Sequence, residues 1–188
     1  MVTSLDKKTA LVLIDLQKGI MQFPIAKPVN EILEKAAALV SAFHKANLPV
    51  VVVNVDPTKS LLNTLRTDAN AKFTSFPDEW FEIAPEIKTI ESDIFITKHT
   101  WNAFTNPNLD IELKKRGITG IVLAGISTSV GVEGTARAAS EYGYNITFAE
   151  DAIADTNADA HEHSIKRIFP RLGEVDEVDK IIDALSAR

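Results

Sequence analysis

The sequence contains no cysteine, and this absence excludes several kinds of chemistry. None of the 188 residues can form a disulfide, supply a thiolate metal ligand or act as a thiol nucleophile. Disulfides belong mainly to oxidising compartments, so a chain without cysteine fits the cytoplasm, and we predict a cytoplasmic location.

Concentrated positive charge is also missing. The chain has 20 Lys and Arg residues against 26 Asp and Glu residues, its formal net charge is −6, and its basic runs are short, such as Lys7-Lys8 and Lys114-Lys115-Arg116. Binding to nucleic acid needs a basic surface. We therefore expect no nucleic acid partner, and a small-molecule substrate instead.

Long apolar segments are absent as well. No run approaches the roughly 20 apolar residues that cross a bilayer, so we expect no membrane contact. The apolar stretch near the N-terminus is short and is soon interrupted by Asp15, which does not fit a signal peptide. The length suits one domain, which we expect to span residues 1–188.

What the chain does contain is an alternation of apolar runs and segments with helical periodicity. The expected strands are residues 9–14, 50–55, 93–97, 120–124, 145–149 and, weakly, 171–175. The expected helices are residues 30–48 with Asn30 as N-cap, 109–116, 129–142, 159–169 and 178–186. Fully apolar strands that alternate with helices predict an α/β protein with a parallel sheet covered on both faces.

Residues 56–90 interrupt this alternation with prolines and aromatic side chains. We expect a long excursion with short helices, which could act as a lid. Arg66 within it is a candidate for binding a substrate carboxylate. Phe76 and Trp80 could line the site or pack in the core.

Three expected strands end at residues that could carry chemistry. Asp15 follows the first strand, Lys98 follows the third, and residues 125–131 connect the fourth strand to a helix. Because ligands of open parallel sheets bind beyond the carboxyl ends of the strands, these ends could meet at one site. Burial would raise the pKa of Asp15 and suit it to acid-base work, although the residue could instead cap a turn. Lys98 could pair with Asp15 or lie in solvent.

The turn at residues 125–131 has two interpretations. Its backbone N–H groups could form an oxyanion hole, or the hydroxyls of Ser127, Thr128 and Ser129 could cap the helix. The histidines show no ligand spacing: His161 and His163 do not share a helical face, and His44 is expected in solvent. We expect no metal and no cofactor.

Three segments together resemble the isochorismatase-like hydrolases, a superfamily that includes nicotinamidases, N-carbamoyl amidohydrolases and isochorismatases. They read LVLIDLQ, FITKHTWNAFTNPNLD and GIVLAGISTSVGVEGTARAASEYGYNITFAEDAIAD. The resemblance covers residues 9 to 172. It implies a single-domain, Rossmann-like three-layer fold of about six parallel strands flanked by helices. It also implies a homo-oligomer, dimer or larger.

The resemblance further implies a site. Most members use an aspartate, a lysine and a cysteine; Asp15 and Lys98 match the first two, and Gly131 occupies the position of the cysteine. A cis peptide bond is implied between Ile126 and Ser127, beside the backbone N–H of Gly131.

Residues that follow Lys98 in the motif are expected to contact the substrate. Trp101 and Phe104 could form its wall or pack in the core, and Asn102 could donate a hydrogen bond to it. Ser127 and Thr128 are the expected oxyanion-binding residues.

Glycine at position 131 closes the covalent thiol route. The leading hypothesis is hydrolysis of a vinyl ether in a small anionic metabolite, as in conversion of isochorismate to pyruvate and a dihydroxy acid, with Asp15 as general acid. Two alternatives stay open. The chain could be a catalytically silent binding protein of the same fold, or an amide or ester hydrolase that uses a bound water.

Overall fold

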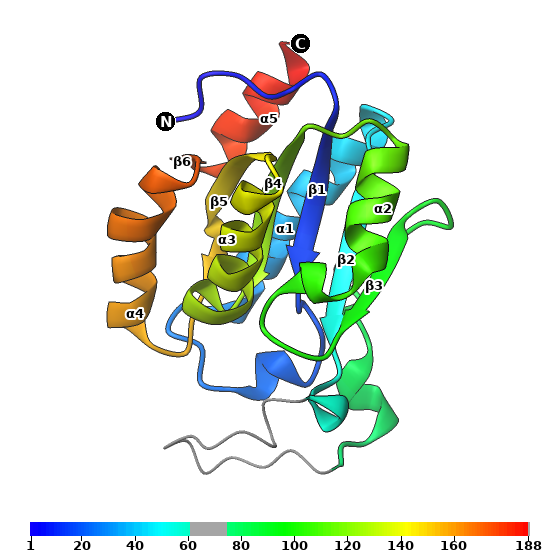
Figure 1. Cartoon of the computed structure of the whole chain (residues 1–188). Coiled ribbons are helices and arrows are strands. Elements are labelled where there is room, and N and C mark those ends of the chain that lie inside the picture. Colours follow the sequence, from blue (N-terminus) through cyan, green and yellow to red (C-terminus); the bar gives the residue numbers. More distant parts are fainter. Residues whose placement is uncertain (61–74, 188) are drawn as a thin grey trace.

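The computed structural model of the protein describes residues 1–60 and 75–187 (Figure 1). Its centre is a six-stranded, entirely parallel sheet in the order β3-β2-β1-β4-β5-β6. The strands are β1 (Thr9–Ile14), β2 (Val50–Val55), β3 (Ile94–Lys98), β4 (Gly120–Ile126), β5 (Asn145–Ala154) and β6 (Glu174–Asp176). The predicted three-layer α/β fold with about six parallel strands is confirmed.

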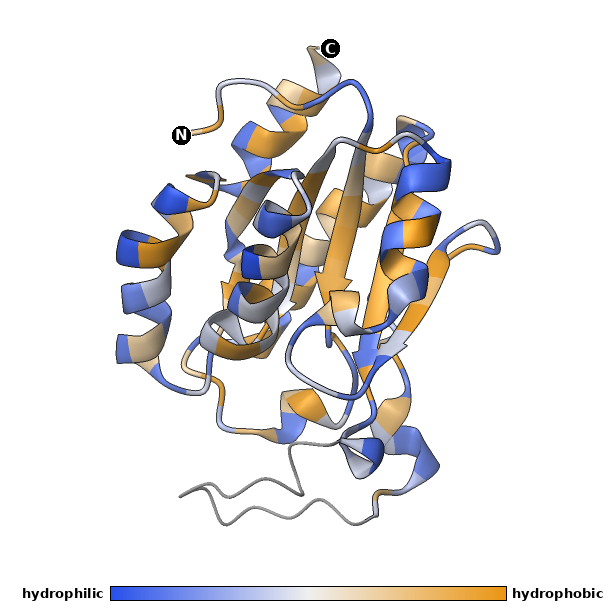
Figure 2. Ribbon diagram, in the orientation of Figure 1, coloured by the Kyte–Doolittle hydropathy of each residue, from blue (hydrophilic) through white to orange (hydrophobic). Residues whose placement is uncertain are grey.

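Helices cover both faces of this sheet. Helices α1 (Val29–Lys45) and α5 (Val178–Ser186) lie on one face, and α2 (Pro107–Lys115), α3 (Glu133–Glu141) and α4 (Ala158–His163) lie on the other (Figure 1). Each face of the sheet has its own hydrophobic core. Within β1, Leu11 and Leu13 pack in the core on the side of α1 and α5, while Val12 and Ile14 pack in the core on the side of α2 and α3. Strand β1 is therefore buried on both faces, which explains its unbroken apolar sequence (Figure 2).

The termini of several elements differ from the sequence prediction. Helix α1 begins at Val29 with Pro28 in the N-cap position, so Asn30 lies inside the helix and the predicted Asn30 cap is wrong. Helix α2 begins at Pro107, two residues early, because the Asn106 side chain accepts from the backbone N–H of Asn108. Helix α5 has its predicted bounds.

Strand β5 is longer than predicted. It continues to Ala154, past the charged Glu150 and Asp151, whereas the predicted strand ends at residue 149. After a register shift between Leu123 and Gly125 of β4, the last residues of β5 pair again with the end of β4. The predicted helices at 129–142 and 159–169 each divide into an α-helix and a wider π turn, at residues 128–132 and 164–168.

The loop after β1 is held by part of the 56–90 excursion. Trp80 is buried, and its ring lies so close to Gly19 that an added Cβ there would be 2.1 Å from the indole nitrogen. Phe76 stacks on Trp80 at 4.2 Å between ring centroids, so both aromatics support this loop. Arg66 and the rest of residues 61–74 of the expected lid lie outside the described residues. No helix in the described ranges is long and apolar enough to span a membrane.

We expect Gly125→Ala to destabilise the protein by more than ~3 kcal/mol, because a Cβ at this φ of +126° would lie 2.1 Å from the carbonyl oxygen of Ile14. Urea denaturation measures the loss. Gly143 is the matched control: its φ is +85° but no atom lies within 4 Å of the added Cβ. Gly143→Ala should cost only ~1 kcal/mol, and equal losses would contradict the steric argument.

Candidate active site

Asp15 and Lys98 form a buried ion pair at the carboxyl edge of the sheet. Asp15 is the first residue after β1, and Lys98 is the last residue of β3, on the far side of β2. The Lys98 Nζ lies 2.7 Å from Asp15 Oδ2 and also donates to the carbonyl oxygen of Thr100 at 3.0 Å. The expectation that the two side chains meet is thereby fulfilled, and Lys98 is not in solvent.

Asp15 leaves the strand in an unusual conformation. Its φ is +52°, a region in which aspartate is better tolerated than most residues, and its backbone N–H donates to the carbonyl oxygen of Val53. Asp15 is 4% exposed, and its Oδ1 is a buried oxygen without a hydrogen-bond partner among the described residues. Lys98 therefore binds one oxygen of the carboxyl group, and the other oxygen accepts no hydrogen bond from any described residue.

Burial controls the protonation of Asp15. Removal from water raises its pKa from the ordinary 3.8 to about 6, while the charge and hydrogen bond of Lys98 act in the opposite direction and only partly compensate. With this pKa, about a tenth of the molecules carry the proton at pH 7. The group can therefore serve as a proton donor near neutral pH.

Gly131 lies directly against this pair. A Cβ added at Gly131 would be 3.2 Å from Asp15 Oδ2 and 2.8 Å from Ile14 Cγ2. The position that the resemblance assigns to a nucleophile is thus adjacent to the carboxylate, as a catalytic triad would require. The peptide bond between Ile126 and Ser127 is cis, as expected.

The hydroxyls of the 127–131 turn do not cap the helix, so the capping interpretation is wrong. Ser127 occupies the N-cap position without a side-chain hydrogen bond. The cap comes instead from Asp155, whose Oδ2 accepts from Ser129 N at 2.7 Å and from Ser129 Oγ at 2.8 Å. Thr128 is fully buried, with its hydroxyl 2.7 Å from Nδ1 of His161.

The other expected site residues are placed as follows. Trp101 is 57% exposed, and its Cβ would be 3.4 Å from a Cβ at Gly134 of α3. The Asn102 side-chain oxygen accepts from Phe104 N, so this part of Asn102 stabilises a turn. Phe104 packs in the core and stacks on Tyr142 at 5.2 Å, which favours its packing role over a role as substrate wall.

The histidines are dispersed. His44 lies 2.8 Å from Asp93 and is partly buried, so the expectation that it is in solvent is wrong. His99 contacts the carbonyl oxygen of Asp56, and His161 contacts Thr128. Among the residues that the structure describes, no group of three or more His, Asp or Glu residues could hold a metal ion.

Sequence reasoning missed three residues that shape the site. Gln17 is fully buried and bonds to both backbone groups of Val55, which fixes the loop after Asp15 to the end of β2. Asp155 and His161 hold the turn that carries Gly131. Asp155 follows an apolar run, which is the same signal that singled out Asp15, whereas Gln17 follows a single leucine and has no such signal.

Comparison with known proteins identifies the family. Residues 9–180 match the isochorismatase domain, so the chain belongs to the isochorismatase family of hydrolases. It is 39% identical to the uncharacterized isochorismatase family protein YecD of Escherichia coli O157:H7, over 95% of this chain and 97% of YecD. It is 26% identical to nicotinamidase 3 of Arabidopsis thaliana, over 94% of this chain and 88% of that protein.

A solved structure supports the same conclusion. An isochorismatase family protein from Burkholderia thailandensis superposes with a TM-score of 0.92 and is 37% identical, covering 97% of this chain and 98% of its own. The fold and the family are therefore shown, while the reaction must be argued from the site.

The raised pKa of Asp15 should be visible in carbon-13 NMR of its carboxyl group, with a midpoint near pH 6. Native protein then holds a proton that unfolded protein loses between about pH 4 and 6, so this group stabilises the fold at low pH. The difference in free energy of unfolding between wild type and Asp15→Asn should fall by ~3 kcal/mol as pH rises through that window. Lys98→Met should raise the midpoint, and a wild-type midpoint near 4 would contradict the burial argument.

Gly131→Ala should destabilise the protein by ~1–3 kcal/mol, because its methyl group would overlap Ile14 and press on Asp15. Gly134→Ala, on α3, is the control, since its nearest contact is an ordinary 3.4 Å. That change should be neutral or stabilising by up to ~1 kcal/mol. Thermal melting of both variants checks the difference, and a stable Gly131→Ala protein would show that the site has room.

Proposed function

We propose that the protein hydrolyses a vinyl ether in a small anionic metabolite, with Asp15 as general acid and without a covalent intermediate. One observation carries the proposal. Asp15 is buried, has a pKa near 6 and keeps Oδ1 free, while the neighbouring position 131 has no side chain. The site thus combines a proton donor with the absence of a nucleophile.

The chemistry begins with the proton on Oδ1 of Asp15. It passes to the terminal methylene carbon of the enol-pyruvyl ether, where the electrons of the double bond form the new C–H bond. The adjacent carbon, bound to the ether oxygen, becomes an oxocarbenium-like cation. Water adds to this carbon and returns a proton to Asp15. The resulting hemiketal transfers its hydroxyl proton to the ether oxygen as the C–O bond breaks, which releases pyruvate and an alcohol.

Lys98 has a positioning role in this scheme. Its ammonium group binds Oδ2, so that Oδ1 is the oxygen that presents the proton. Its charge also keeps the pKa of Asp15 from rising further, which preserves an equilibrium between acid and carboxylate near neutral pH. The anionic part of the substrate would be bound by the backbone N–H groups of Ser127 and Gly131 and by Arg66.

Covalent catalysis by a hydroxyl is less compatible with the contacts. The Thr128 hydroxyl approaches a histidine, as a nucleophile would, but the residue is fully buried. The Ser129 hydroxyl is engaged by the buried carboxylate of Asp155. Both groups stabilise the turn instead of facing Asp15.

The proposal is tested by measuring pyruvate release from isochorismate and related enol-pyruvyl ethers. A coupled enzymatic reduction of the pyruvate makes the release measurable. Wild type should release pyruvate, and kcat/KM should fall about tenfold per pH unit above pH 6 as Asp15 loses its proton. Asp15→Asn should lose ~10²–10⁴-fold in kcat, the usual contribution of a general acid.

Two variants serve as controls for the nucleophile. Ser129→Ala and Thr128→Val should retain activity within about tenfold, because neither hydroxyl forms a bond to substrate. Hydrolysis of amides such as nicotinamide without any pyruvate release would favour the water-dependent amidase. Ligand binding without turnover of ethers, esters or amides would favour the silent binding protein. Full activity of Asp15→Asn would sink the acid role.

Three properties stay predictions of the sequence. These are the cytoplasmic location, the homo-oligomeric state and the lack of a nucleic acid partner. The described surface is compatible with association, since the side chains of Phe95 and Ile111 are more than half exposed.

A further inference from the structure

Asp155 is a buried carboxylate that the proposed reaction does not use. It directly follows β5 and is 3% exposed. A carboxylate is stable in such a place only when its oxygens accept hydrogen bonds, so the partners of Asp155 indicate what it holds. These partners lie in the turn that carries Gly131 and at the beginning of α4.

One oxygen of Asp155 binds the turn. Oδ2 accepts from the backbone N–H of Ser129 at 2.7 Å and from the hydroxyl of the same residue at 2.8 Å. Two hydrogen bonds to one residue fix its orientation as well as its position. Ser127 occupies the N-cap position without a side-chain hydrogen bond, so the carboxylate of Asp155 takes the role of the cap.

The rest of Asp155 is bound to other segments. Its Oδ1 accepts from the backbone N–H of Asn157, the N-cap residue of α4, at 3.1 Å. Its backbone oxygen accepts from the N–H of Ala26, in the segment between β1 and α1, at 2.8 Å. Asp155 is therefore held independently of the turn and gives the turn a fixed point of attachment.

The turn that Asp155 holds lies against the catalytic carboxyl group. Gly131 is two residues after Ser129, and a Cβ added to it would be 3.2 Å from Oδ2 of Asp15. In the proposed reaction, the backbone N–H groups of Ser127 and Gly131 bind the anionic part of the substrate. A displaced turn would therefore move the substrate away from Oδ1 of Asp15, the oxygen that presents the proton.

We propose that Asp155 is a positioning residue: through Ser129 it sets the distance between the 127–131 turn and Asp15. The inference rests on the proposed function, because that function assigns the anion of the substrate to the turn. Asp155 takes no part in the proton transfer and acts only through the turn. A shift of about 1 Å between reacting groups can cost ~100-fold in rate, so a small displacement is sufficient.

Asp155→Asn and Asp155→Ala test this role. The amide replaces an acceptor with a donor that opposes the N–H of Ser129 or Asn157, and alanine removes both acceptors. In each variant, kcat for pyruvate release should fall ~10–100-fold, while KM should change less than about threefold. KM is kept because the N–H groups still bind the anion and the substrate moves with them. The kinetics are measured at a temperature at which circular dichroism shows every variant folded.

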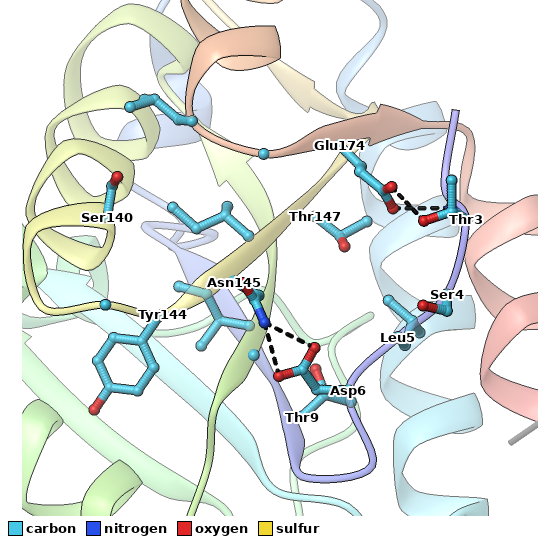
Figure 3. Close-up of a pocket in the computed structure, with 16 residues that line it drawn as sticks. Thr3, Ser4, Leu5, Asp6, Thr9, Ser140, Tyr144, Asn145, Thr147 and Glu174 are labelled. Carbon is cyan, nitrogen blue, oxygen red and sulfur yellow. Dashed lines mark hydrogen bonds between the residues drawn. The ribbon is translucent and has the colours of Figure 1, made fainter.

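Two variants control for lost stability and lost charge. Asp6 lies before β1, at the opposite edge of the sheet, where both of its oxygens accept from the side-chain nitrogen of Asn145 at 3.1 Å (Figure 3). Asp159 is an exposed residue in the first turn of α4. Asp6→Asn and Asp159→Asn should keep the kcat and KM of wild type. A loss in either control equal to that in Asp155→Asn, or wild-type kcat in both Asp155 variants, would overturn the proposal.

NMR without substrate separates this inference from the proposed function. In Asp155→Ala, the amide signal of Gly131 and the carboxyl carbon signal of Asp15 should both shift, and the amide of Ser129 should exchange with solvent at least about tenfold faster. In Asp6→Asn these signals should stay in place. Unchanged signals in Asp155→Ala would overturn the positioning role even if wild type hydrolyses the ethers. If wild type releases no pyruvate, the proposed function fails, and the same signals decide whether Asp155 sets the turn against Asp15.

Discussion

The buried ion pair between Asp15 and Lys98 is the interaction on which the site depends. Two charges are removed from water, which is tolerated only because they meet at 2.7 Å. Asp15 follows β1 and Lys98 ends β3, so the pair connects the ends of two strands that lie on either side of β2. The order of the strands therefore determines which side chains meet at the carboxyl edge of the sheet.

The sequence predicts much of this fold because its signals are local. The apolar strands, the helical periodicity and the strand ends were enough to predict the sheet, the last helix and the convergence of Asp15 and Lys98. The length of β5 was misjudged because pairing with the end of β4 overrode the local preference of Glu150 and Asp151 for a strand end. Asn30 was misjudged because helix α1 begins one residue earlier, at Val29, so the asparagine lies inside the helix.

The turn around Gly131 shows where local reasoning stops. Its serine and threonine residues have the composition of a helix cap, but the cap is Asp155, which lies 26 residues from Ser129 in the chain. His161 reaches Thr128 from α4 in the same way. Such partners become visible only when β4 and β5 are placed side by side. The role of Arg66, which lies outside the described residues, stays a prediction.

The packing of Trp80 against Gly19 has a practical consequence. The chain holds two tryptophans, and they report on different surroundings: Trp80 is 6% exposed behind the loop that follows Asp15, and Trp101 is 57% exposed. A soluble quencher distinguishes them, since it reaches only the exposed indole. The protein thus carries an intrinsic optical signal for any opening of the segment beside its carboxylate, without a dye or a label.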